Sequence, residues 1–179
     1  MDVHQAIITR RSVRSYSPRP IPPEVEDRMR QALRYAPSAC NIQPWRFIWV
    51  TDPQTRKEVA RASNDQLWMA EAPVTVVGCG LPDQAYKGMG GSGNSVEIDV
   101  AIALDHLSLA AVAEGLGTCW IGAFDEQEIK RLLGVPPEVK VVAMIPLGYP
   151  ASPELNHPLD DTARKPRAEV FSAERYAPA

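Results

Sequence analysis

The sequence has no long apolar run, no basic leader segment and no excess of positive charge. A stretch that crosses a bilayer needs roughly 18 apolar residues, and the longest candidate, residues 96–113, is interrupted by Asp99 and Asp105. The first residues lack the basic and apolar regions of a signal peptide. The 19 basic and 22 acidic residues give a net charge of -3, which does not suit a nucleic-acid binder. We therefore expect a cytoplasmic protein with no nucleic-acid or membrane partner.

Cysteine and histidine are scarce as well. The three cysteines, Cys40, Cys79 and Cys119, lie far apart and form no CxxC pair. The three histidines are isolated from one another and from the cysteines. This usage suits a reducing compartment and provides neither a disulfide framework nor a zinc site, so we expect no protein-ligated metal.

Apolar periodicity and capping residues predict alternating helices and strands. Helices are expected where apolar residues recur every three to four positions behind an aspartate or proline, and strands where apolar runs are short and unbroken. The predicted helices cover residues 2–9, 22–36, 53–62, 95–115 and 125–133, and the predicted strands residues 47–50, 74–78, 119–121 and 139–145. The helix 95–115 is apolar nearly all round, which favours a central position. This order indicates one domain of mixed α and β structure.

Proline is unusually frequent: it makes up 17 of the 179 residues, whereas its usual share is about 5%. Many of them fall after Tyr149, and proline continues neither a helix nor a central strand. Residues 151–179 are therefore predicted to be an extended tail. Such a tail cannot bury itself, so it must lie along its own domain or wrap another chain, and wrapping would imply an obligate dimer.

Three arginines, Arg10, Arg11 and Arg14, fall within five residues, with Ser12 between them. Guanidinium groups are well shaped for bidentate contacts with phosphate, and a serine adds a neutral donor. A phosphate-bearing ligand therefore fits this segment. The alternative is a solvated basic corner, favoured by the negative end of the preceding helix, and the cluster alone leaves both interpretations open.

A loop of small residues, 36–45, joins the second predicted helix to the first predicted strand. Its carboxamides, Asn41 and Gln43, each donate and accept hydrogen bonds, which suits the edge of a flat heterocycle. The alternative is an ordinary helix-to-strand turn in which Asn41 bonds its own backbone.

Six short motifs, in this order, resemble the nitroreductase family of flavoenzymes. They are RRSVRSY at 10–16, PSACNIQPWRF at 37–47, EAPV at 71–74, GLGTCWIG at 115–122, IPLGYP at 145–150 and RKP at 164–166. The resemblance spans nearly the whole chain. It implies an α+β fold with a mixed sheet surrounded by helices, in a domain-swapped homodimer. Residues 1–179 would form a single FMN-binding domain, and the tail 151–179 would embrace the partner.

The resemblance also implies a site for FMN at the subunit interface. The first motif would bind the phosphate, the ribityl oxygens and the pyrimidine edge, and the last motif would clamp the phosphate. The loop beside the isoalloxazine would come from the other chain, and a backbone amide in the fourth motif would point towards flavin N5. The implied cofactor-binding residues are Arg10, Arg11, Ser12, Arg14, Pro37, Ser38, Ala39, Asn41, Gln66, Gly122, Arg164 and Lys165.

The chain departs from the family pattern at two places. Many relatives carry another lysine where this chain has Thr162, so the phosphate would depend more on Arg10 and Lys165. A polar flavin contact is expected between the third helix and the second strand, where Asn64, Asp65 and Gln66 are available, and we favour Gln66.

The implied activity is an FMN-dependent oxidoreductase that passes hydride from NADH or NADPH to a small acceptor such as a nitroaromatic or a quinone. Arg14 is the candidate cation near flavin N1, and no side chain is assigned as a general acid. Trp49 and Trp120 are expected in the core, and Trp68 towards the pocket. A flavin-storing, flavin-sensing or flavin-degrading protein is the alternative, and a redox-inactive binder of a phosphate ligand is a third possibility.

Overall fold

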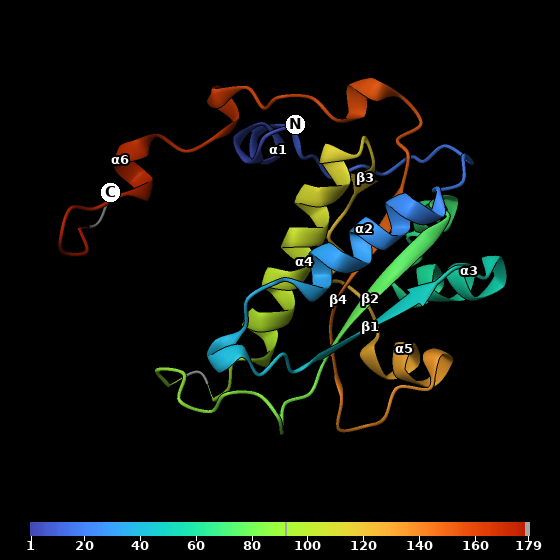
Figure 1. Cartoon of the computed structure of the whole chain (residues 1–179), viewed down its shortest axis with the longest axis horizontal. Helices are drawn as coiled ribbons and strands as arrows, with labels where there is room; N and C mark the ends of the chain where they lie inside the picture. The colour runs from blue at the N-terminus through green and yellow to red at the C-terminus, as the bar shows by residue number, and fades with distance from the viewer. Residues whose placement is uncertain (92, 178–179) are drawn as a thin grey trace.

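A computed structural model describes residues 1–91 and 93–177, and these residues form a fold around a four-stranded sheet. The strands are β1 (Trp45–Val50), β2 (Val74–Gly80), β3 (Gly117–Thr118) and β4 (Lys140–Gly148), in the spatial order β1-β2-β4-β3. Neighbouring strands are antiparallel, and among the described residues the parallel pairing is a single bridge from Ser12 to Thr118. Strands and helices together confirm the predicted α+β class (Figure 1).

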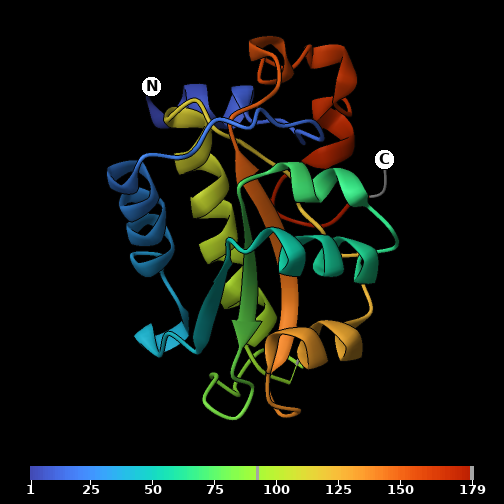
Figure 2. The same ribbon diagram turned by 90° about the vertical axis from the view of Figure 1, so that its right-hand side faces the viewer.

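Helices cover both faces of the sheet (Figure 2). They are α1 (Val3–Thr9), α2 (Pro23–Arg34), α3 (Pro53–Ala62), α4 (Val96–Ala113), α5 (Glu126–Leu133) and α6 (Arg167–Val170), with short 3-10 turns η1 (Ala39–Asn41), η2 (Leu67–Glu71), η3 (Pro153–Leu155) and η4 (Asp161–Ala163). One apolar core lies between the sheet and α2 and α4, and a second between the sheet and α3, α5 and η2. In the part of the chain that the structure describes, no helix is long and apolar enough to cross a membrane.

Local capping explains where several helices begin and end. The carboxylates of Asp2, Asp52 and Asp125 each accept a hydrogen bond from the backbone N–H three residues later, which satisfies a donor that the first helical turn leaves free. Gly134 ends α5 in the left-handed region at φ 65°, where glycine is favoured. The predictions based on these residues are confirmed.

The strand β2 and the helix α4 form the centre of the molecule. Every residue of β2 is buried, as its unbroken apolar run predicts. The helix α4 packs against α1, α2 and all four strands, which agrees with the predicted central position. It is not buried all round, because Ile98 on its outer face is 47% exposed.

The predicted strand at residues 119–121 is wrong in its position. The ladder with β4 is formed two residues earlier, by β3, and Ile121 adds only an isolated bridge to Met144. Side chains then alternate in direction: Cys119 and Ile121 are buried, whereas Trp120 is 37% exposed and faces outwards. The expectation that Trp120 lies in the core is therefore wrong as well.

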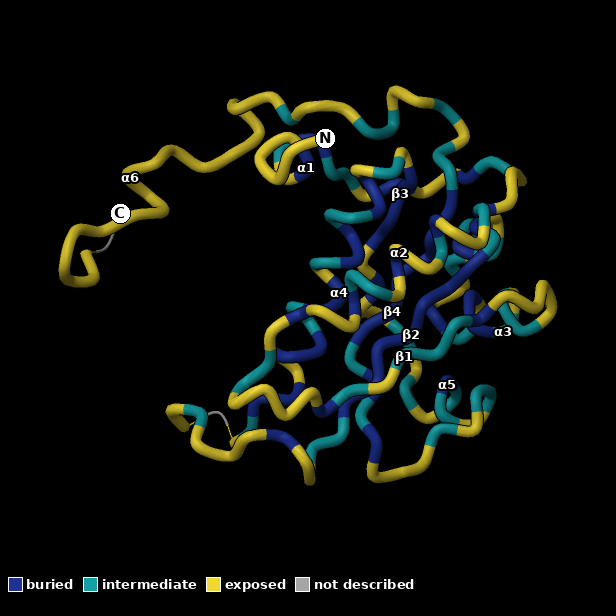
Figure 3. Tube along the Cα trace, viewed as in Figure 1, coloured by how far each residue is buried: buried dark blue, intermediate teal, exposed yellow. Residues whose placement is uncertain are grey.

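The tail is only partly extended, which corrects the prediction. The turns η3 and η4 and the short helix α6 interrupt it, because Pro153 and Pro166 start helical turns rather than prevent them. Its first part is held by hydrogen bonds from Asn156 Nδ2 to the carbonyl of Leu116 and from the N–H of Leu159 to α1. From residue 160 to residue 177 every residue is exposed (Figure 3), and the tail leaves the body (Figure 1).

Replacing Gly117 by alanine is expected to destabilise the fold. A Cβ at this position would lie 2.7–2.9 Å from the side chain of Val13, which is buried and stiff because it is β-branched. Such overpacking costs about 1–3 kcal/mol, measurable as a lower free energy of unfolding in denaturant. The control is Gly122→Ala, where nothing lies within 4 Å of the new methyl group and the change should stay within about 0.5 kcal/mol. Equal stabilities of the two variants would contradict the close approach of Val13.

Candidate functional site

The basic segment, residues 10–14, leaves α1 and runs beside β3. The N–H of Val13 donates to the carbonyl of Thr118 over 2.9 Å, and the Val13 side chain is buried. Because successive side chains of an extended segment point in opposite directions, Ser12 and Arg14 are exposed on the other side. The segment therefore presents polar groups at the surface next to the chain that follows β3.

Arg11 is turned back onto the end of α1. Its terminal nitrogens donate to the carbonyls of Ile8 and Arg10, where the helix dipole is negative. Its Nε is buried and has no hydrogen-bond partner among the described residues. Burial, followed by the positive charges of Arg10 and Arg164, lowers the pKa of Arg11 from its ordinary value. The charges of Arg10 and Arg164 thus act on Arg11, and among the described residues none of the three forms an ion pair, which favours binding of an anion.

The tail brings further positive charge to this place. Arg164 is near enough to Arg11 to act on its pKa. The ion pairs found among residues 1–91 and 93–177 involve other basic side chains. Five basic residues of the predicted site are therefore without an ion pair in this protomer, namely Arg10, Arg11, Arg14, Arg164 and Lys165.

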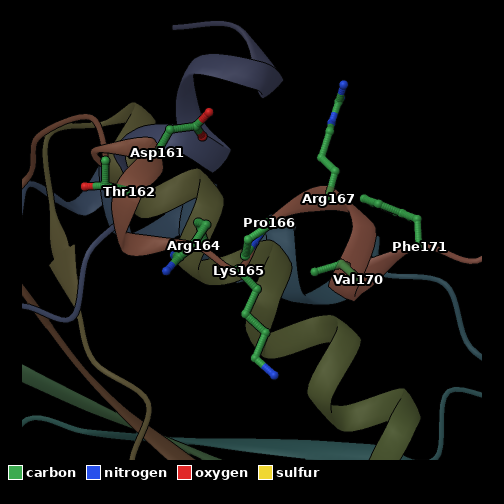
Figure 4. A pocket seen from close by; sticks show the side chains of 8 residues that line it. All are labelled: Asp161, Thr162, Arg164, Lys165, Pro166, Arg167, Val170 and Phe171. Carbon is green, nitrogen blue, oxygen red and sulfur yellow. The ribbon is translucent and has the colours of Figure 1, made fainter. Parts of the chain in front are cut away.

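The tail also forms a hollow of about 1160 Å³ (Figure 4). Its lining residues are Asp161, Thr162, Arg164, Lys165, Pro166, Arg167, Val170 and Phe171. All of them belong to the tail, so the body of the same chain supplies no second wall. Lys165 and Arg167 point to opposite sides of the tail (Figure 4), so they do not act on one ligand in this protomer.

The loop 37–43 holds three residues in the left-handed region: Cys40, Asn41 and Gln43 have φ angles of 51°, 55° and 57°. Each such non-glycine residue costs about 1–3 kcal/mol and is kept only where the surroundings enforce it. The Ser38 hydroxyl accepts from the N–H of Gln43 over 2.9 Å. All three left-handed residues are exposed, so the loop is a shaped projection rather than a buried turn.

The loop and the basic segment lie at opposite ends of α4 (Figures 1 and 2). The N–H of Ala39 donates to Asp99 in the first turn of α4, whereas Val13 bonds Thr118, beyond the last turn. A helix of 18 residues is about 27 Å long. One protomer therefore does not bring Pro37, Ser38, Ala39 and Asn41 to the arginines.

Gln66 and Gly122 are placed differently from each other. Gln66 is half-buried, and its Nε2 donates to the carbonyl of Ser63 over 2.9 Å, so its side chain turns back towards α3. Asn64 and Asp65 beside it are exposed and left-handed, with φ of 55° and 54°. Gly122 is exposed, and the space beside its Cα is open, so its backbone is accessible to a ligand.

Two titratable side chains beneath the basic segment are poor proton carriers. Burial raises the pKa of the Cys119 thiol, and Arg14 and a hydrogen bond with Ser12 only partly oppose this. Burial also raises the pKa of Tyr16 far above its ordinary value, and its hydroxyl donates to the carbonyl of Val13 over 2.8 Å. Neither group is suited to proton transfer near neutral pH. In the described residues, no three His, Cys, Asp or Glu side chains gather as a metal site.

Two carboxylates position these segments, a role that the sequence did not predict for them. Asp99 bonds the loop, as described above, and Glu71 Oε2 accepts from the N–H of Tyr16 over 3.1 Å. A signal for Asp99 was present, because an acidic residue on the inner face of an apolar helix needs a partner. The sequence shows nothing comparable for Glu71, which is exposed.

Comparisons with known proteins show which proteins this chain is similar to. The model of the nitroreductase family matches residues 7–85 and 64–149. The chain is 30% identical over 181 residues to the FMN reductase [NAD(P)H] of Bacillus subtilis, covering 93% of this chain and 70% of that protein. It is 35% identical over 166 residues to a 5,6-dimethylbenzimidazole synthase of Rhodobacter capsulatus, covering 79% and 80%.

Among solved structures, a nitroreductase family protein of Clostridium difficile 630 superposes with a TM-score of 0.86 at 25% identity, covering 98% of this chain and all of that one. The family model covers more than half of the sequence, and the superposition extends over the whole fold. The chain belongs to the nitroreductase family.

Proposed function

We propose that this protein is an FMN-dependent oxidoreductase that takes electrons from NADH or NADPH and delivers them to a small acceptor. The observation that carries the proposal is that Arg10 and Arg164 lie near enough to Arg11 to act on its pKa, and that none of the three forms an ion pair among the described residues. Membership of the nitroreductase family and the similarity to an FMN reductase support FMN as the ligand. Bound FMN supplies hydride transfer at N5, in two successive half-reactions, to an acceptor such as a nitroaromatic or a quinone.

The residues present fit the phosphate of FMN. Guanidinium groups bind phosphate oxygens in pairs. Burial, followed by the charges of Arg10 and Arg164, lowers the pKa of Arg11, and a bound dianion would oppose both by favouring the charged guanidinium. Arg11 is partly committed to the end of α1, so Arg10 and Arg164 are the freer donors, and Lys165 adds charge. These side chains bind and orient the cofactor.

The polar surface beside β3 suits the flavin ring. Ser12 and Arg14 are exposed there, and we assign Arg14 to the edge of the ring at N1, where a cation stabilises negative charge. The N–H of Gly122, an exposed residue, is assigned to N5. Gln66 would need to turn away from the Ser63 carbonyl to contact the ring.

Two copies of the chain are needed to complete the site. The loop residues Pro37, Ser38, Ala39 and Asn41 lie at the far end of α4 from the arginines, so a second copy must supply them. The exposed tail has no cover from its own chain. We propose a domain-swapped homodimer in which residues 1–179 form one FMN-binding domain and residues 151–179 wrap the partner.

A second function is kept because a relative at 35% identity is named a 5,6-dimethylbenzimidazole synthase rather than a reductase. On this alternative, the protein stores, senses or degrades flavin and has no external acceptor. It uses the same phosphate and ring contacts, so the residues described above support both functions equally.

Anaerobic mixing of the flavin-loaded protein with NADH and with NADPH separates the two functions. We expect the visible absorbance of the flavin to bleach with at least one donor and to return when a quinone or a nitroaromatic compound is added. Bleaching with neither nucleotide would overturn the reductase proposal. Bleaching that only oxygen reverses, with loss of flavin, would favour the alternative.

A further inference from the structure

The flavin-facing loop, residues 38–43, needs an external support for its conformation. Three of its residues are left-handed without being glycine, which is stable only when neighbouring contacts enforce it. Inside the loop, Ser38 Oγ accepts from the N–H of Gln43, and Gln43 Nε2 donates to the carbonyl of Asn41 over 3.0 Å. Both bonds involve exposed residues that water can replace as partners, so they do not fix the loop on the body.

Asp99 supplies a buried link between this loop and α4. Its side chain is 2% exposed, and its Oδ1 accepts from the N–H of Ala39 over 2.9 Å. Its Oδ2 accepts from the hydroxyl of Ser95 over 2.6 Å, and Ser95 is itself fully buried. In the described residues Asp99 has no ion pair, so its charge is compensated by hydrogen bonds and by the N-terminal turn of α4.

This arrangement is more than a helix cap. A capping carboxylate bonds the free N–H groups of its own helix, whereas Asp99 Oδ1 bonds a residue 60 positions earlier in the chain. The hydroxyl of Ser95 bonds Oδ2 and so fixes the rotation of the carboxylate. Since both residues belong to the start of α4, this end of α4 determines where Oδ1 points and therefore where the N–H of Ala39 lies.

We infer that Asp99 is a positioning residue that fixes the loop 38–43 on α4 so that Ser38, Ala39 and Asn41 meet the FMN of the partner subunit. The inference rests on the proposed function. Asp99 is buried behind the loop and acts through the backbone of Ala39. The left-handed residues 40, 41 and 43 are then held in the shape that presents the Asn41 carboxamide to the ligand.

The test uses the full-length protein with Asp99→Leu, Asp99→Asn and Ser95→Ala. Leucine keeps the branched shape but is larger and has no acceptor, whereas asparagine matches the size of aspartate and keeps an oxygen for the N–H of Ala39. Hydrogen exchange of the backbone amides in residues 37–44 reports the loop directly, without FMN. Loss of one charge-assisted hydrogen bond should speed this exchange about tenfold in Asp99→Leu. FMN affinity, measured by fluorescence titration per folded molecule, should weaken about tenfold in the same variant.

Asp99→Asn should restore most of the slow exchange and most of the affinity, because its carboxamide oxygen replaces Oδ1. Ser95→Ala should show a smaller change in the same direction, and it keeps the inference testable if Asp99→Leu does not fold. The matched control is Ser108→Ala, which removes a buried hydroxyl of α4 whose hydrogen bonds, among the described residues, go to residue 105 of the same helix. It should lower thermal stability without changing loop exchange or FMN affinity.

Unchanged exchange in residues 37–44 of both Asp99→Leu and Ser95→Ala would overturn the inference. Faster exchange with unaltered FMN affinity would also overturn it, because the loop would then be fixed for a reason other than flavin. An Asp99→Asn variant as weak as Asp99→Leu would overturn the role of the acceptor oxygen. If the wild-type protein itself does not bind FMN, the failure belongs to the proposed function, and the titration of the wild type identifies it.

Discussion

Removing residues 161–179 is expected to convert a flavin-loaded dimer into a monomer that retains no flavin. The residues described in this segment are exposed throughout, so the truncation removes little that stabilises the chain's own fold. It does remove Arg164 and Lys165, together with the surface that would cover the partner. Size-exclusion chromatography with light scattering and visible absorbance measures mass and bound flavin together.

The apolar side chains of the tail are the physical reason for this expectation. Val170, Phe171 and Tyr176 are 57%, 71% and 92% exposed, on a segment that leaves the body (Figure 1). Apolar side chains gathered on a projecting segment indicate a contact surface. Each would lose unfavourable contact with water on burial against a second copy.

Two further variants of the chain separate the effects that the truncation combines. A longer deletion, of residues 151–179, also removes the bonds of Asn156 to Leu116 and of Leu159 to α1, and it should lower the thermal stability of the monomer in addition. The full-length double variant Arg164→Ala, Lys165→Ala keeps the wrapping surface and should remain a dimer with weaker FMN binding. A fully flavin-loaded dimer after removal of residues 161–179 would refute the role of the tail.

Local signals in the sequence predicted the elements that local forces determine. The capping residues Asp2, Asp52 and Asp125 each bond a backbone N–H only three residues away. The unbroken apolar run of β2 by itself indicates that the strand is buried. Such features need no knowledge of the rest of the chain. For this reason the order of helices and strands from α1 to β4 was predicted correctly, whereas α6 was not predicted.

Features that depend on contacts between distant residues could not be predicted in this way. The position of β3 depends on Val13, which packs against Gly117 from a segment about one hundred residues earlier in the sequence. The direction of Arg11 depends on which carbonyls the end of α1 exposes. The hydrogen bond between Asp99 and Ala39 joins two elements, and neither sequence pattern indicates that the two are in contact. In each case the tertiary partner, rather than the residue type, decides the outcome.

The candidate site shows both what residue types can predict and what depends on contacts between distant residues. Residue types alone left phosphate binding by the arginines as one of two open interpretations, and the structure brings Arg164 near enough to Arg11 to act on its pKa. Residue types could not show that Arg11 donates hydrogen bonds to carbonyls at the end of α1. They also could not show that the loop 37–43 lies at the other end of α4 from the arginines. The assignment of individual contacts to FMN therefore stays a prediction.

Arg10→Ala is expected to weaken FMN binding about tenfold or more. A hydrogen bond to a charged group contributes roughly 1.5–3 kcal/mol, and each 1.4 kcal/mol corresponds to about a factor of ten in affinity. Arg10 is the cleanest probe, because in the described residues its guanidinium makes neither a hydrogen bond nor an ion pair, whereas that of Arg11 also caps α1. Fluorescence titration of the flavin-free protein measures the affinity.

Riboflavin separates the phosphate contact from contacts with the ring. If Arg10 binds the phosphate, Arg10→Ala should weaken FMN binding and leave riboflavin binding unchanged, so that the preference of the protein for FMN falls by the same factor. Arg10→Ala combined with Arg164→Ala should lose more, but not the product of the single effects, because both groups face one anion and are coupled. Arg61→Ala, on the exposed last turn of α3, is the matched control and should bind both ligands as the wild type does. A preference for FMN that survives in Arg10→Ala would show that the early arginines bind something other than its phosphate.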